Sequence, residues 1–408
     1  MNVLLTLLLV LQSAWGHPQQ KPESGNILGH LWQVAWSNLE KSQVSGGAVA
    51  SPTPKPSPTP VNGGSSGGEA GVPHADPQPD APKVKGVYVT AYSAGGERMS
   101  TLLDLLDKTA LNAMVIDIKD DLGYITYKTD NPELQKLGTP MRFIKDIGAL
   151  MDTLKKHEVY PIARIVVFKD SVLAKKHPEL SFVTANGTVW QNGKKDSFVN
   201  PYRKEVWDYN IAVAKEAAKL GFKEIQFDYV RFPEGFEKKA DGLKFTKTDE
   251  SRTDVVSGFV NYAKEQLEPL GVRVSVDIFG YAASVPAAEG IGQDFGKISS
   301  NVDVISPMIY PSHYSTGWFK QKDPDKAPYA TIKGAMVDTN KKLAPLADAK
   351  PVIRPWIQDF TASWLGSGHY IKYGATEVQA QIKALHDSGV DEYLLWNATN
   401  RYTSGVQY

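Results

Sequence analysis

Two apolar runs each carry one aspartate that could take part in catalysis. The first run, GFKEIQFDYVRFP at 221–233, contains Asp228, with Arg231 three residues later. The second run, VRVSVDIFG at 272–280, contains Asp277. Two carboxyl groups in different charge states can cleave a glycosidic bond: one attacks or activates water, and the other protonates the leaving oxygen. The alternative for either aspartate is a structural role, such as capping a loop or, for Asp228, pairing with Arg231.

The immediate neighbours suggest a role for each aspartate. Arg231 would help to keep Asp228 ionised, which suits a nucleophile. The apolar neighbours Val276 and Ile278 would raise the pKa of Asp277 and suit a proton donor. Adjacent strands lie about 4.8 Å apart, which allows the carboxyl separation of about 5–5.5 Å typical of a retaining mechanism. Asp228 and Asp277 are therefore the predicted catalytic pair.

Further polar and aromatic residues follow other apolar runs and are predicted to bind the substrate. Asp117 could grip sugar hydroxyls or pair with Arg164, whereas Asp359 could grip hydroxyls or be the true partner of Asp228. Trp and Tyr faces, including that of Tyr92, suit sugar rings, but core packing is the alternative for each. The predicted substrate-binding residues are Asp117, Arg164, Arg231, Tyr310, Trp356, Asp359 and Trp396.

These candidates lie on apolar runs that alternate with helix-patterned segments. Near-continuous apolar runs are typical of strands buried on both faces, and eight of them predict an α/β fold, the (β/α)8 TIM barrel. In such a barrel the C-terminal ends of the strands converge on one face, where barrel enzymes do their chemistry. The rival is a doubly wound open sheet, which is disfavoured because no glycine-rich nucleotide turn follows the first run. The predicted strands are 85–91, 112–121, 160–170, 224–233, 272–280, 302–311, 350–360 and 392–399.

The first part of the chain differs in composition from the barrel. Residues 1–16, MNVLLTLLLVLQSAWG, resemble a secretory signal peptide, because the apolar run is shorter than the roughly 20 residues that span a bilayer. Residues 17–45 include a short segment with helical spacing, and the Pro-, Gly- and Ser-rich residues 46–82 predict a disordered linker. Residues 83–408 are left for the barrel. This organisation predicts a protein that is secreted or associated with the cell envelope.

The end of the chain leaves little room for an eighth barrel helix. The last predicted strand ends at Thr399, and the nine residues that follow are too few for a helix of normal length. The segment Ile27–Val44 has apolar residues at helical spacing. We expect either this segment or an open gap at the place of the eighth helix.

Composition and missing motifs exclude several classes of function. Lys plus Arg equals Asp plus Glu, 45 each, which gives no support to a nucleic-acid partner. The chain has no cysteine, so disulfides, thiolate metal sites and a cysteine nucleophile are excluded. No HExxH pattern, Walker loop or GxSxG nucleophile elbow is present either. The predicted chemistry therefore needs neither a metal nor a cofactor.

Four motifs resemble a known family. KGVYVTAYSAGG, VIDIKDDLGYITY, QFDYVRFP and SVDIFGY are similar to the putative glycosyl hydrolase domain family of bacterial secreted and wall-associated proteins, over about Lys83 to Thr399. The resemblance implies a glycoside-hydrolase-like (β/α)8 barrel that hydrolyses glycosidic bonds in a poly- or oligosaccharide of a cell wall or capsule. The alternative is a non-catalytic glycan-binding or envelope-associated barrel with the same fold.

The order of the acids also resembles α-amylase-type barrels. Those enzymes carry a nucleophile after strand four, an acid/base after strand five and a third carboxylate after strand seven, and Asp228, Asp277 and Asp359 occupy comparable places. In two respects this chain departs from that pattern. There an arginine precedes the nucleophile, whereas Arg231 follows Asp228, and there the fifth-strand acid is normally Glu, where this chain has Asp277. The resemblance therefore implies the place of the cleft and leaves the role of each acid open.

Overall fold

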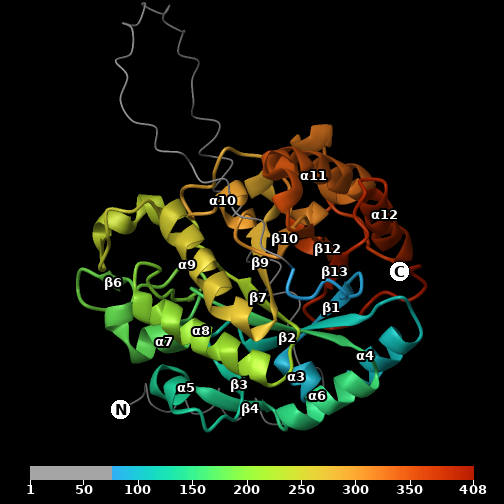
Figure 1. The fold of residues 1–408 in the computed structure, drawn as a ribbon. Helices are drawn as coiled ribbons and strands as arrows, with labels where there is room; N and C mark the ends of the chain where they lie inside the picture. Colours follow the sequence, from blue (N-terminus) through green and yellow to red (C-terminus); the bar gives the residue numbers. More distant parts are fainter. Residues whose placement is uncertain (1–75) are drawn as a thin grey trace, which may run out of the picture.

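Eight parallel strands close into a ring in the computed structural model, which describes residues 76–408 (Figure 1). In order around the ring they are β1 (Lys85–Val89), β2 (Ala113–Lys119), β5 (Tyr160–Val166), β7 (Glu224–Asp228), β9 (Arg273–Phe279), β10 (Val304–Met308), β12 (Trp356–Gln358) and β13 (Tyr393–Trp396). β1 pairs with both β2 and β13, so the ring has no free edge. The predicted (β/α)8 barrel is confirmed, and the doubly wound open sheet is excluded. Each predicted run contains one ring strand, and the seventh also contains the short β11 (Val352–Ile353), which pairs with β10.

Helices between the strands cover the outside of the ring (Figure 1). They are α3 (Ala91–Ala94), α4 (Arg98–Asp107), α5 (Pro132–Leu137), α6 (Ile147–Lys156), α7 (Ser171–Lys176), α8 (Lys204–Lys219), α9 (Arg252–Leu267), α10 (Phe295–Ser299), α11 (Pro328–Leu343) and α12 (Ala375–His386). Polar side chains define several starts: Ser251 accepts a hydrogen bond from the Asp254 amide at α9, and Asp146 accepts one from Ala149 at α6. Short 3-10 turns fill other connections.

The apolar residues form two separate cores, because successive side chains of a strand point to opposite faces. The inner core fills the ring with residues such as Val115, Ile162 and Leu394. The outer core lies between the strands and the helices and includes Met114 of β2 and Phe259 of α9. The ring is therefore packed with side chains and is not a pore.

The N-terminal end of the ring is closed by charged groups and by the chain itself. Arg354 lies inside the ring with one guanidinium nitrogen 2.8 Å from both carboxylate oxygens of Glu224. Below this pair, Asp76 forms an ion pair with Arg273, and the Gln78 side chain donates to backbone carbonyls next to β7 and β9. Residues 76–82, predicted as the end of the linker, thus lie against the barrel. The rest of the linker, residues 1–16 and the segment 17–45 lie outside the described residues.

The chain returns across the barrel after β13 without forming a helix. In residues 397–408 the structure has turns and extended backbone, so no eighth helix follows β13 there. Gln407 and Gln379 exchange two hydrogen bonds, which hold this tail against α12. The segment Ile27–Val44, which was expected as one alternative at the place of this helix, lies outside the described residues. Among residues 76–408, no helix is both long and apolar enough to cross a membrane.

Two small strand pairs project from the ring. β3 (Ile125–Tyr127) pairs antiparallel with the end of β2, and β4 (Pro140–Ile144) pairs parallel with β3. β6 (Val183–Thr184) and β8 (Leu243–Lys244) form a separate antiparallel pair. β3 and β4 were not predicted from the sequence.

Candidate active site

Four neighbouring strands bring four of the predicted residues to the C-terminal end of the ring. Asp117 of β2 is paired in register with Arg164 of β5. Val166, two residues after Arg164 on β5, is paired with Asp228 of β7. Between β7 and β9, the pairing of Phe227 with Val276 places Asp228 level with Asp277 on adjacent strands. Residues far apart in the chain therefore meet at the face where barrel enzymes carry their active sites.

Asp228 is held by the guanidinium of Arg164. Its Oδ2 accepts hydrogen bonds from Nη2 and Nε of Arg164 at 2.6 and 3.1 Å, and its Oδ1 accepts one from the Tyr229 amide at 2.6 Å. Tyr229 has a φ of 52°, a left-handed conformation that is unfavourable for a bulky residue and often marks functional sites. Both the counter-charge and the strained backbone fix the direction of this carboxylate.

Arg231 does not take the place predicted for it beside Asp228. Its guanidinium forms an ion pair with Glu234 at 3.0 Å and lies 4.7 Å from the centre of the Tyr229 ring. The counter-ion of Asp228 is Arg164, which reaches it from the neighbouring strand β5. The chain turns away from the strand after Asp228 and carries Arg231 with it, which is why Arg231 is not the counter-ion that the sequence predicted.

Asp277 has an environment very different from that of Asp228. Burial raises the pKa of Asp277 well above its usual range, and the nearby charge of Asp228 raises it further. Trp356 donates a hydrogen bond from Nε1 to Oδ1 of Asp277 at 2.7 Å and opposes this shift in part. The Trp356 bond uses Oδ1 and leaves Oδ2 as the other carboxyl oxygen of Asp277. This oxygen is the one that could carry a proton toward a ligand.

Arg164 also binds two other carboxylates. Its Nη1 lies 2.7 Å from Oδ1 of Asp117 and 3.2 Å from Oδ2 of Asp121, and Tyr88 donates from its hydroxyl to the other oxygen of Asp117 at 2.6 Å. Burial raises the pKa of Asp117 to about 7, against the opposing charge of Arg164. Burial would also raise the pKa of Asp121, but Arg164 and Lys169 outweigh it and hold that pKa well below its usual range. One cation thus lies between carboxyl groups with different proton affinities.

Aromatic rings wall this network. Tyr88 and Trp396 are stacked with centroids 4.0 Å apart, and Trp356 meets Trp396 edge-on at 5.5 Å. Trp356 is buried and its ring nitrogen is bonded to Asp277, so it positions the acid and does not offer a face to a sugar. Tyr310 is buried too and packs against Phe360, whereas Trp396 is half-buried. Core packing therefore accounts for Trp356 and Tyr310, and Trp396 keeps part of its surface in solvent.

Asp359 has a different partner from the predicted one, and Tyr88 belongs to the site although it was not predicted. Both oxygens of Asp359 accept hydrogen bonds from Thr403, one from the hydroxyl and one from the amide, so Asp359 binds the C-terminal tail instead of Asp228. Tyr88 was not predicted, although it lies on β1 and its ring fills the inner core. The alternation of side chains along KGVYV could have placed Tyr88 inside the ring, because Val87 and Val89 on either side of it point to the outer face.

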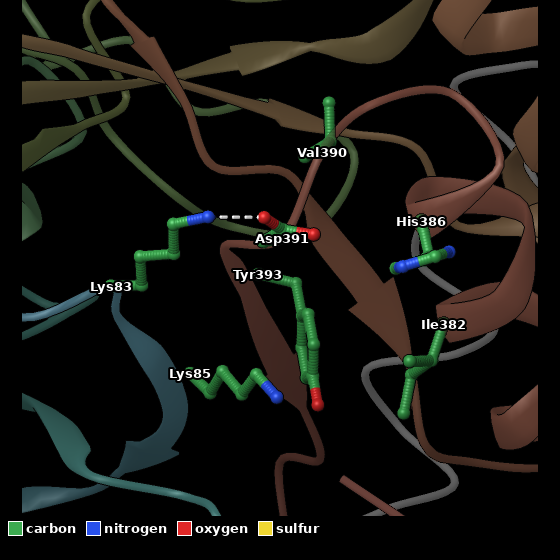
Figure 2. A pocket seen from close by; sticks show the side chains of 7 residues that line it. All are labelled: Lys83, Lys85, Ile382, His386, Val390, Asp391 and Tyr393. Atoms are coloured by element: carbon green, nitrogen blue, oxygen red, sulfur yellow. Dashed lines mark hydrogen bonds and ion pairs between the residues drawn. The ribbon is translucent and has the colours of Figure 1, made fainter.

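A hollow of about 220 Å³ lies far from these residues, at the other end of the barrel (Figure 2). Lys83 and Lys85 line it just before β1 and at its start, His386 lines it at the end of α12, and Tyr393 lines it from β13. Lys83 forms an ion pair with Asp391 there. The hollow contains none of the predicted catalytic residues. In the described part of the chain, no three His, Asp or Glu side chains are grouped to hold a metal ion.

A family model described as a putative glycosyl hydrolase domain matches residues 86–402 of the chain. The chain belongs to this family. The match includes every strand of the ring from Gly86 onward and both aspartates of the predicted pair. No curated protein matches the chain.

Several solved structures are similar to this glycosyl hydrolase domain. The glycoside hydrolase domain of PgaB (BpsB) from Bordetella bronchiseptica is 12% identical, with a TM-score of 0.56 over 78% of this chain and 95% of that one. A hypothetical protein from Ruminiclostridium thermocellum is 36% identical, with a TM-score of 0.43 over 47% of this chain and 96% of that one. The spore cortex-lytic enzyme SleL of Bacillus cereus is 11% identical, with a TM-score of 0.47 over 78% of this chain and 72% of that one. The likeness to PgaB shows a common barrel fold.

Proposed function

We propose that this glycosyl hydrolase domain cleaves glycosidic bonds in a poly- or oligosaccharide, with Asp228 and Asp277 as the catalytic pair and with retention of configuration. The observation that carries the proposal is the contrast between two carboxyl groups on adjacent strands. Arg164 supplies a positive charge to Asp228, whereas burial keeps the proton on Asp277. Pairs of titratable groups with opposite environments are the usual sign of an acid and a base or nucleophile.

The proposed reaction has two steps. Asp228 attacks the anomeric carbon and forms a glycosyl ester, while Asp277 gives its proton to the departing oxygen. Asp277, now ionised, then removes a proton from water, and the resulting hydroxide attacks the same carbon and releases Asp228. The hydrogen bond from Trp356 stabilises the charge that Asp277 carries between the two steps. Adjacent strands about 4.8 Å apart suit the roughly 5–5.5 Å separation of a retaining site.

The proposal extends to where the protein works. The signal-like residues 1–16 and the Pro- and Gly-rich residues 46–82 support export, followed by display at or release from the cell envelope. A wall or capsule glycan is the substrate that fits such a location. Neither a metal nor a cofactor takes part in the proposed steps.

A non-catalytic glycan-binding barrel is the second candidate. One observation favours it: Asp117 and Asp228 are both hydrogen-bonded to Arg164, and all three side chains are almost fully buried. A network of this kind can hold a rigid binding surface without performing chemistry.

Measurement of turnover distinguishes hydrolysis from non-catalytic glycan binding. Purified protein is incubated with a panel of bacterial wall and capsular glycans, and released reducing ends are measured for the wild type, Asp228→Asn and Asp277→Asn. We expect Asp277→Asn to lose roughly 10²–10⁴-fold in kcat, the usual contribution of a general acid. The control is Asp391→Asn, which changes a surface carboxylate at the other end of the barrel that pairs with Lys83.

The stereochemistry of the product tests the mechanism separately. Proton NMR of the first product formed should show the same anomer as the substrate. Wild-type turnover by both Asp228→Asn and Asp277→Asn would refute the assignment of the pair, and an inverted first product would refute the ester intermediate.

A further inference from the structure

An aromatic surface lies beside the candidate active site, where β3 and β4 extend the sheet beyond β2 and α3 packs against β4 (Figure 1). Tyr92 of α3 is 66% exposed, and its ring centre lies 4.5 Å from that of Phe143 of β4. Tyr124 meets Phe143 edge-on at 6.0 Å. We call Tyr92, Tyr124 and Phe143 the aromatic shelf.

The backbone holds the aromatic shelf in one place. At the start of α3, the Thr90 amide donates to Oδ1 of Asn400 at 2.9 Å. At its end, Gly95 approaches β4 so closely that a Cβ there would lie 2.0 Å from the Phe143 carbonyl oxygen. Phe143 is backed in turn by the outer core. Tyr92 is therefore an exposed ring on a rigid support, which lowers the entropy lost when a ligand binds to it.

The shelf is continuous with the site at the mouth of the ring. Oδ1 of Asp120 accepts a hydrogen bond from the Tyr124 amide at 2.9 Å, and the next residue, Asp121, binds Arg164 at 3.2 Å. Arg164 in turn binds Asp228. A line of bonded groups thus leads from the shelf across β2 and β5 to the proposed nucleophile, and a linear ligand crossing the mouth would pass over both.

The chemistry of the shelf points to a sugar. A flat, exposed tyrosine offers an apolar face with a polar tip, which matches a pyranose ring that has C–H groups on its face and hydroxyls at its edge. Carboxylates at 120 and 121 are acceptors for such hydroxyls and would repel an anionic sugar.

We propose that the aromatic shelf is a remote subsite that binds an uncharged pyranose unit of a polysaccharide, away from the bond that is cleaved. The inference rests on the proposed function, since the shelf extends the site formed by Asp228 and Asp277. It makes the domain selective for long chains, because a short glycoside that fills the catalytic end does not reach Tyr92.

Binding and turnover are measured separately to test the shelf. Affinity electrophoresis is run in gels containing soluble β-1,4-glucan, β-1,3-glucan or galactomannan, with wild type, Tyr92→Ala and Tyr92→Phe. We expect Tyr92→Ala to bind the retarding polymer about tenfold more weakly, because about 50 Å² of ring surface would no longer be covered at roughly 25 cal/mol per Å². Tyr92→Phe should bind as the wild type does. The matched control is Tyr329→Ala, another exposed tyrosine, on α11.

The outcomes distinguish the shelf from the proposed hydrolysis. Tyr92-dependent retardation without turnover of any polymer would refute hydrolysis and keep the shelf. Hydrolysis of a polymer with equal affinity and kcat/KM for wild type and Tyr92→Ala would overturn the shelf, and so would the lack of retardation of the wild type by every polymer. Turnover of p-nitrophenyl glycosides should not change in Tyr92→Ala, and a parallel loss there would also overturn the shelf.

Discussion

Replacing Asp117 with asparagine should flatten the dependence of the free energy of unfolding on pH. Asp117 is buried between the hydroxyl of Tyr88 and the guanidinium of Arg164, and burial raises its pKa to about 7. In the unfolded chain its pKa returns to about 3.9. Between these two values the folded protein holds a proton that the unfolded chain has released.

The sign and size of the effect follow from this difference. The stabilisation is fully present below the unfolded pKa and is lost as the pH rises through the folded pKa. A difference of about three pKa units, at about 1.36 kcal/mol each, amounts to about 4 kcal/mol between pH 4 and pH 7. The asparagine side chain of the Asp117→Asn variant would be neutral at every pH and would contribute no such slope.

The assay is urea unfolding at a series of pH values, for example about pH 4.5, 6 and 7.5. The wild type should lose more of its free energy of unfolding than Asp117→Asn as the pH rises. Asp391→Asn is the control, because Asp391 is a surface carboxylate at the other end of the barrel whose pKa is lowered by Lys83. Parallel slopes for the wild type and Asp117→Asn would refute the reasoning.

Two further predictions concern the groups that hold the proposed catalytic pair. Arg164→Met should lower the free energy of unfolding by about 3–5 kcal/mol, because it leaves buried carboxylates without their counter-charge, and Arg164→Lys should restore part of this loss. Urea unfolding measures both, and an Arg164→Met protein as stable as the wild type would contradict the prediction. Trp356→Phe removes the donor that lowers the pKa of Asp277, so the basic limb of the kcat–pH profile should move to higher pH. A limb that stays in place, or moves to lower pH, would show that this bond does not tune the acid.

The ring and the position of the site could be predicted from the sequence because both depend on regular patterns. Buried strands give continuous apolar runs, and each run from 85–91 to 392–399 contains a strand of the ring. Since parallel strands end on the same face, Asp117, Arg164 and Asp228 were expected to meet there, and they do.

The bonding partners within the site could not be predicted in the same way. Arg231 is close to Asp228 in the sequence, but the turn after β7 carries it to Glu234. Asp359 ends a strand as expected, yet a tail residue, Thr403, takes both of its oxygens. Such contacts depend on loop paths and on residues far away in the chain, which no local pattern encodes. The short strands β3 and β4 escaped prediction because their segment has no long apolar run.

The pairing of β1 with β13 has a consequence for how the protein is made. Tyr393 of β13 lies beside Lys85, 308 residues later in the chain, so a ribosome adding about 5–20 residues per second needs roughly 15–60 s to supply the partner strand. During that time β1 presents an unpaired edge, which is a template for aggregation. Because Asn400 also fixes the start of α3, the candidate active site can be assembled only when synthesis has passed that residue. A chaperone that shields β1 during translation should therefore raise the yield of active protein more than one that acts on the released chain.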